Sequence, residues 1–151
     1  HGGTPLHRAI ERYCPGALQA LIAVGASVDD PAPNDERRYR PLHLAAKFRG
    51  LESSGRKAQQ EAAEMARILV NAGAAVNGVD ATGWTPLHMA VAAGNLPLVE
   101  LLLASGADQT LKAPVLGAFG VVDTSLPPAT PLELAKAKLQ ADHPVLLLLS
   151  A

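Results

Sequence analysis

The chain has 151 residues, of which 48% are hydrophobic and only 3% aromatic, so aliphatic side chains and alanine must supply the packing of any core. That length suits one compact domain or a short array of repeats. Thirteen lysines and arginines against 14 aspartates and glutamates give a formal net charge of −1 with no polybasic block, which argues against a nucleic-acid binder that neutralises phosphates.

Cysteine usage and hydropathy narrow the class of protein further. Cys14 is the only cysteine, so an intramolecular disulfide and a cysteine-based metal site are both excluded. The sequence has no run of 18 apolar residues and no signal-peptide pattern. We therefore expect a cytoplasmic protein, although the abrupt start of the chain is compatible with the loss of an upstream targeting segment.

One pattern recurs four times along the chain, and it predicts where helices begin and end. Proline suits a first helical turn because its missing N–H would have no partner there, and a preceding threonine can cap the helix. In the first three copies Gly25, Gly73 and Gly106 follow a second helix-period segment, where a left-handed residue ends a helix. In each copy an alanine lies three residues after the leucine. The four copies are Thr4-Pro5-Leu6-His7, Arg40-Pro41-Leu42-His43, Thr85-Pro86-Leu87-His88 and Thr130-Pro131-Leu132-Glu133.

The pattern resembles the ankyrin repeat, a β-turn and two antiparallel helices in 33 residues with a T-P-L-H-x-A signature. The resemblance implies an all-α repeat solenoid in which helix-turn-helix repeats are joined by β-hairpin-like loops. We expect a single ankyrin-repeat domain over residues 1–151. Its repeats would span about 1–33, 34–81, 82–126 and 127–151, and the last would be degenerate or truncated.

The resemblance also implies a structural role for the histidines of the motif. His7, His43 and His88 are expected to hydrogen-bond backbone and threonine groups between adjacent repeats. Because these histidines stand one repeat apart, they are too distant to share a zinc ion at the roughly 2.0–2.1 Å of a zinc–nitrogen bond. No metal or cofactor is expected.

The spacing of the repeated prolines and glycines places two insertions, at about 50–61 and 111–126. The first is expected to lengthen a helix at its start, because residues 56–71 favour a helix that Ser53 or Ser54 can cap. This extension would be either a solvated projection or a recognition element. An apolar stripe at i, i+3, i+4 and i+7 supports the helix, formed by Ala62, Met65, Ala66 and Leu69.

The second insertion belongs to a long segment, residues 111–128, that combines turn residues with apolar ones and carries two charges. Loops of this length are usually functional or disordered, and a disordered linker is usually polar. We therefore expect its apolar side chains to be buried, either on the protein's own concave face or against a partner. These side chains are Val115, Leu116, Phe119, Val121 and Val122.

The last segment, residues 144–151, is apolar. Leu147 stands where the preceding repeat has Glu100, although a terminal repeat needs a polar outer face. This predicts either that the chain is a fragment of a longer protein or that this end docks on something.

The sequence contains no motif that indicates catalysis. Phosphate-binding, zinc-protease and serine-nucleophile patterns are all missing. Cys14 precedes a proline between two predicted helices and is interpreted as a free structural thiol. The acidic residues at 29–36 lack the ligand spacing of a calcium loop and are interpreted as solvated. We expect no enzyme activity.

Protein recognition remains as the function that the resemblance implies. Ankyrin-like solenoids bind proteins through hairpin tips and the exposed side of each first helix, which together form a concave surface. Aromatic and arginine side chains are common in binding hot spots. Trp84 could instead pack on the adjacent hairpin, and Phe48 could close a gap beneath the first insertion. The predicted partner contacts are Arg12, Tyr39, Lys47, Phe48, Trp84 and Phe119.

The main hypothesis is a non-enzymatic module, monomeric or part of a longer chain, that binds a protein of unknown identity. The alternative is a targeting or regulatory domain of a larger multidomain enzyme or effector. A nucleic-acid-associated regulator is a weaker alternative and is not expected. A local basic patch for it would consist of Arg37, Arg38, Arg40, Lys47 and Arg49, but acidic residues stand close by.

Overall fold

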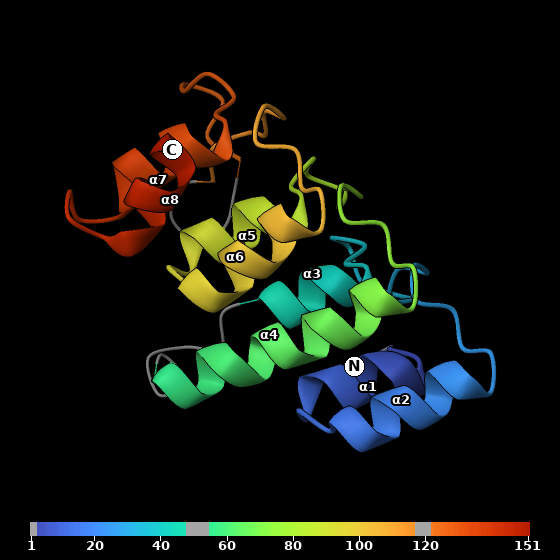
Figure 1. Cartoon of the computed structure of the whole chain (residues 1–151). Helices are drawn as coiled ribbons and strands as arrows, with labels where there is room; N and C mark the ends of the chain where they lie inside the picture. The colour runs from blue at the N-terminus through green and yellow to red at the C-terminus, as the bar shows by residue number, and fades with distance from the viewer. Residues whose placement is uncertain (1–2, 48–54, 117–121) are drawn as a thin grey trace.

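The computed structural model describes residues 3–47, 55–116 and 122–151. Within these ranges the chain forms eight α-helices in four successive pairs (Figure 1). The pairs are α1 (Pro5–Glu11) with α2 (Pro15–Ala23), α3 (Pro41–Ala46) with α4 (Arg56–Asn71), α5 (Pro86–Ala92) with α6 (Leu96–Ala104), and α7 (Pro131–Lys138) with α8 (Pro144–Ser150).

The repeated motif starts the first helix of each pair, as the sequence predicts. Proline occupies the first turn of α1, α3, α5 and α7. In α5 the Thr85 hydroxyl accepts from the His88 amide, and the Thr85 amide donates to Nδ1 of His88, both at 3.3 Å. In α7 Glu133 replaces the histidine and accepts from the Thr130 amide at 2.8 Å. The degenerate last motif therefore still closes a capping box.

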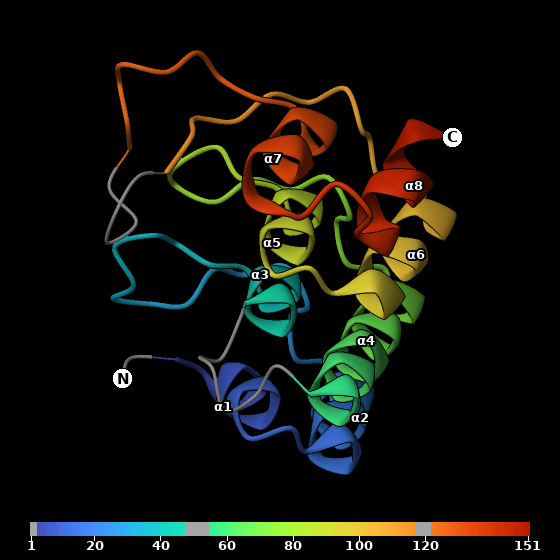
Figure 2. The same cartoon turned by 90° about the vertical axis from the view of Figure 1, so that its left-hand side faces the viewer.

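The helices form two rows that run along the length of the molecule. The first-helix row contains α1, α3, α5 and α7, and the second-helix row contains α2, α4, α6 and α8 (Figure 2). Successive members pack on one another within each row. The connecting segments between pairs project beyond the first-helix row, on the side away from the second-helix row (Figure 2). This is the ankyrin-type solenoid that the resemblance implies.

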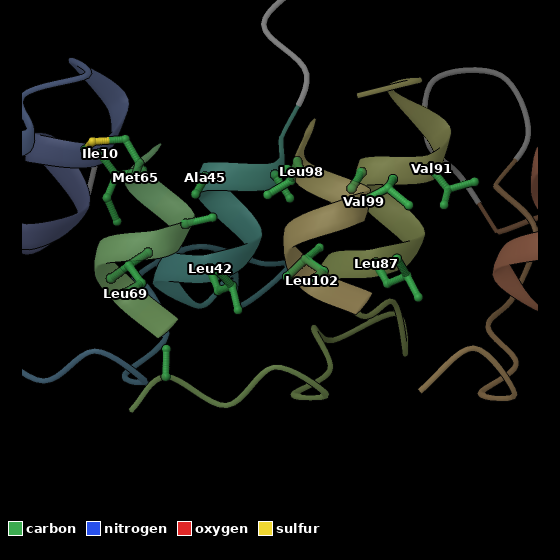
Figure 3. Close-up of a cluster of buried hydrophobic side chains, with 14 of the residues drawn as sticks. Ile10, Leu42, Ala45, Met65, Leu69, Leu87, Val91, Leu98, Val99 and Leu102 are labelled. Atoms are coloured by element: carbon green, nitrogen blue, oxygen red, sulfur yellow. The ribbon is translucent and has the colours of Figure 1, made fainter. Parts of the chain in front are cut away.

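One continuous apolar core runs between the two rows (Figure 3). Small residues of the first helices, Ala45 and Ala90, are almost wholly buried, which allows neighbouring helices to approach closely. Larger side chains fill the space between them, including Ile10, Leu42, Met65, Leu69, Leu87, Leu98 and Leu102. Aliphatic side chains thus fill the core in place of aromatic ones.

The helix expected over the first insertion is confirmed. Helix α4 spans 16 residues, against nine for α2 and for α6, and its buried residues are Ala62, Met65, Ala66 and Leu69. Gly55 is the N-cap, with no side-chain cap, and the two serines proposed as caps lie outside the described residues. Aligned on Gly73 and Gly106, α4 begins seven residues before α6, which makes it project beyond its neighbours (Figure 1).

The second insertion forms a narrow antiparallel ribbon in its described part. Ala113 pairs with Ala129 through two backbone hydrogen bonds of 2.9 and 2.8 Å, and Leu116 pairs with Val122. Ala113 is buried and Leu116 packs beside it on Trp84. Val122, the bridge partner of Leu116, is 37% exposed, so it is not buried on the protein's own surface, and its burial against a partner stays a prediction. Phe119 and Val121 lie outside the described residues.

The last helix is amphipathic rather than wholly buried. Val145, Leu146 and Leu149 face the core, whereas Leu147 is 70% exposed. Among the described helices, none is long and apolar enough to cross a membrane.

Candidate interaction surface

Buried histidines hold α3 and α5 against the connecting segment that follows each helix, whereas Nε2 of His7 in α1 is buried without a hydrogen-bond partner, contrary to the expectation from the sequence. Nε2 of His43 lies 2.8 Å from the Trp84 carbonyl oxygen, and Nε2 of His88 lies 3.3 Å from that of Ala129. Because a carbonyl oxygen only accepts, each Nε2 carries the proton and donates it. Burial lowers the pKa of both rings, and the backbone hydrogen bonds oppose that shift less strongly. Both histidines are therefore neutral, and each links its repeat to the next one by a hydrogen bond.

The other ring nitrogen depends on the residue at the threonine position. The hydroxyls of Thr4 and Thr85 lie 2.7 and 2.8 Å from Nδ1 of His7 and His88. Arg40 takes the threonine position in the second copy, and Nδ1 of His43 is buried without a hydrogen-bond partner. With arginine at the threonine position, the second repeat leaves a buried hydrogen-bond acceptor, Nδ1 of His43, unsatisfied.

An apolar pocket of about 290 Å³ opens on the first-helix row between α3 and α5. Met89, Ala92 and Ala93 line it at i, i+3 and i+4, so one face of α5 supplies most of the wall. Lys47, the C-cap of α3, and Trp84 complete it. Helix periodicity around Ala92 and Ala93 could have identified Met89, which the sequence reasoning missed.

Trp84 is held in the wall of this pocket by three hydrogen bonds. Its indole Nε1 donates to the Pro114 carbonyl at 2.7 Å, and its backbone amide donates to Asp80 at 2.9 Å. Its carbonyl accepts from His43, as described above. The side chain packs against Ala113 and Leu134 and is only 5% exposed. Trp84 thus packs on the adjacent connecting segment, the alternative that the sequence left open.

Tyr39 is likewise buried and does not form an exposed contact residue. It is 7% exposed, and its ring centroid lies 6.3 Å from that of His43. The ammonium group of Lys47 stands 5.0 Å from the Tyr39 ring centroid, in the geometry of a cation–π contact. Burial raises the pKa of the Tyr39 hydroxyl. The structure therefore brings Tyr39, Lys47 and Trp84 to one region, with Lys47 as its exposed member.

The remaining predicted contacts do not join this group. Arg12 is exposed at the C-cap of α1 and does not line the pocket. Phe48 and Phe119 lie outside the described residues.

The connecting segments are tied to one another by side-chain to backbone hydrogen bonds. Asp29 accepts from the Ala75 amide at 2.8 Å. Asn77 accepts from the Asp108 amide at 2.8 Å and donates to the Gly106 carbonyl at 3.2 Å. The tips therefore keep a fixed spacing. Over the described ranges, no group of three histidine, cysteine, aspartate or glutamate side chains could hold a metal ion.

A second hollow, of about 590 Å³, lies on the second-helix row between the projecting α4 and α6. Its walls carry both signs of charge, with Lys57 and Arg67 facing Glu61, Glu64 and Glu100. Lys57 and Glu61 approach to 3.8 Å, and Arg67 contacts Glu64. These cations are matched within the same hollow, unlike Lys47 beside the apolar pocket.

The helix pairs, their capping histidines and the sequence define the class of protein: the chain is an array of ankyrin repeats. A family model described as "Ankyrin repeats (3 copies)" matches residues 57–113, which include α4, α5 and α6.

Similar proteins carry the same repeats. The chain is 36% identical over 136 residues to the mouse B-cell lymphoma 3 protein homolog, with 74% of this chain and 30% of that protein covered. It is 34% identical over 111 residues to human NF-kappa-B inhibitor alpha, with 74% and 32% covered. It is 37% identical over 102 residues to human Rabankyrin-5, with 68% and 8% covered. The chain thus spans about a third or less of the length of these relatives.

Proposed function

We propose that this chain is a non-enzymatic, cytoplasmic recognition domain that binds a protein partner through the first-helix row and the adjoining tips of the connecting segments. Ankyrin repeats are a protein-interaction module, and the relatives include an inhibitor named for its target, NF-kappa-B.

The apolar pocket between α3 and α5 is the observation that carries this proposal. Met89, Ala92 and Ala93 expose apolar surface there beside an exposed cation, Lys47. Concave apolar surface with a few placed polar groups is typical of binding sites. Fixed connecting segments also favour binding, because little ordering entropy is then lost on association.

The contact set that we propose keeps the predicted residues but divides their roles. Lys47 and Arg12 are exposed and contact the partner directly, whereas Tyr39 and Trp84 support the surface and offer only the parts that border the pocket. Phe48 and Phe119 are retained as proposed contacts from the sequence alone.

Site-specific cross-linking tests this surface. A photoreactive amino acid replaces Ala92 in the pocket or, as the matched control, Ala104 on α6 of the second-helix row. After irradiation in extract from the source organism, the Ala92 position should yield a protein adduct that the Ala104 position does not. Equal adducts at both positions, or an adduct only at Ala104, would contradict the proposed face. The partner thus identified is then titrated against Lys47→Ala and Arg12→Ala.

A second proposal concerns the context of the domain. The chain covers 30% or 32% of two relatives and 8% of a third, which supports a targeting or regulatory domain within a larger effector or enzyme. Sequencing the transcript on both sides of this region tests it, because a reading frame confined to the repeats would overturn this second proposal.

A further inference from the structure

We propose that the partner segment docking on this surface is an acidic peptide whose one large apolar side chain inserts into the pocket between α3 and α5. This inference rests on the proposed function and specifies the chemistry of the partner. It follows from three observations about the first-helix row: its charge, the isolation of Lys47, and the lining of the pocket.

Among the helices, positive charge is concentrated on the first-helix row, whereas the described connecting segments beside it carry seven acidic residues against four basic ones. The four first helices with their C-caps carry five basic residues against two acidic ones, a net charge of +3, on a chain whose total is −1. All seven charged side chains are exposed. The basic ones are Arg8, Arg12, Lys47, Lys136 and Lys138, and the acidic ones are Glu11 and Glu133.

The second-helix row shows that this concentration is not a general property of the helices. Its four helices carry three basic and three acidic residues, which cancel. Two of those cations, Lys57 and Arg67, are paired with glutamates on the same helix. A charged partner segment would therefore distinguish the two rows, and an acidic segment would prefer the first-helix row.

Lys47 carries the part of this charge that borders the pocket. Neither α3 nor α5, with its C-cap, contains an aspartate or glutamate. Among the described residues, no carboxylate forms an ion pair with Lys47, whose ammonium group lies over the face of Tyr39. A ring face orients the ammonium group but leaves N–H groups free to donate. A carboxylate from a partner would complete that site.

The pocket supplies the apolar half of the recognition. Its volume of about 290 Å³ is at the lower limit for small-molecule sites, which suits one side chain rather than a whole ligand. The Met89 thioether adapts to different shapes, and Ala92 and Ala93 leave room above the helix. Trp84, which lines the pocket, donates a hydrogen bond of 2.7 Å to the Pro114 carbonyl of the inserted ribbon, and this bond holds its ring in place. The long insertion thus supports the site.

Selection from a phage-displayed library of random dodecapeptides tests the inference on the whole chain. Enriched peptides should be net acidic and share one leucine, phenylalanine, methionine or tryptophan. The best peptide is then synthesised with a fluorophore, and its affinity is measured by fluorescence polarisation. We expect Lys47→Glu to weaken binding by roughly tenfold or more and to reduce its salt dependence. Filling the pocket with Ala92→Phe should weaken it at least as much.

Matched changes on the other row serve as controls. Lys57→Glu makes the same charge reversal at a side chain that is 91% exposed, and Ala104→Phe places the same ring on α6. Both should leave the affinity within about twofold of the parent. Circular dichroism and the urea midpoint verify that every variant is folded. If Lys47→Glu is unstable, Lys47→Gln and Arg12→Glu test the same charge contribution.

The other outcomes of the peptide selection each overturn a different part of the proposal. Enriched peptides that are neutral or basic but lost with Ala92→Phe would leave the proposed face intact and overturn the acidic partner. Peptides that bind every variant equally would overturn the proposed face itself. Competition by an RNA or DNA oligonucleotide at equal concentration would assign the positive row to phosphates instead. A selection without enrichment would overturn docking of a linear peptide.

Discussion

At the scale of single residues, two motif histidines join the first helices α3 and α5 to the connecting segments that follow them. His43 and His88 span two repeats with one neutral ring, donating through Nε2 to a backbone carbonyl. His88 also accepts through Nδ1 from Thr85. A buried ring of this kind is stabilising only while both nitrogens are satisfied. The first copy fails that condition at Nε2 of His7 and the second at Nδ1 of His43.

Restoring threonine in the second copy should therefore stabilise the fold. In Arg40→Thr the new hydroxyl can donate to Nδ1 of His43, as Thr85 does to His88. Arg40→Val is the matched control, because it has the same shape without the hydroxyl and also loses the arginine's bond to the Asp29 carbonyl. We expect the threonine variant to exceed the valine variant by about 1 kcal/mol in free energy of unfolding. Equal urea midpoints would show that Nδ1 needs no donor.

Stability should also fall on mild acidification. Burial lowers the pKa of His7, His43 and His88 from the ordinary 6.5, so below about pH 6.5 the unfolded chain binds more protons than the folded chain. The contribution of these histidines to the free energy of unfolding is therefore complete above that pH. It is lost as the pH falls through their pKa values in the folded chain. The urea midpoint should decrease between about pH 7 and pH 5, with a shallower decrease in His88→Gln. A flat profile would mean that the folded rings titrate normally.

At the scale of elements, local signals account for the helices but not for the ribbon. Residues 56–71 form a helix because their stripe of Ala62, Met65, Ala66 and Leu69 lies within four turns of one segment. The ribbon instead pairs Ala113 with Ala129. Residues this far apart in the sequence share no local periodic pattern that would predict their pairing. The consequence of this pairing is the burial of Trp84, for which the sequence left two alternatives, a partner contact and packing on the adjacent hairpin.

Trp84 should accordingly behave as a structural residue. Trp84→Phe removes the donor to the Pro114 carbonyl and part of the packing on Leu134, and we expect a loss of about 1–3 kcal/mol in unfolding free energy. Leu126→Ala, at a residue 49% exposed on the same insertion, should change it by less than about 0.5 kcal/mol. Because Trp84 is the only tryptophan, acrylamide quenching reports its burial directly. Quenching as strong as in urea would contradict the structure.

At the scale of the whole molecule, stability is shared between neighbouring repeats. The continuous core passes from Ile10 through Leu42 and Leu87 toward Val145, and each pair of helices contacts the next pair in both rows. Arrays of this kind unfold according to the stability of each repeat and of each interface. A defect at one interface can therefore uncouple the two sides.

Leu87→Ala tests this coupling at the interface of the third repeat. Leu87 is 1% exposed, so the cavity should cost about 2–5 kcal/mol and should broaden or split the single unfolding transition. Leu147→Ala provides the control, since the same change at a 70% exposed residue of α8 should cost less than about 0.5 kcal/mol. An unchanged midpoint for Leu87→Ala would show that this leucine does not bridge the repeats.

The sequence by itself determined the class of fold, the start of each first helix and the long α4. These features depend on capping, proline and helical period, which act within a few residues of one another. Only the tertiary structure decided that Tyr39 and Trp84 are covered, that Lys47 stands beside Met89 and Ala92 at one pocket, and that the insertion supports Trp84. Those relations join residues from different repeats, and side-chain exposure depends on what the neighbouring repeat places over each position.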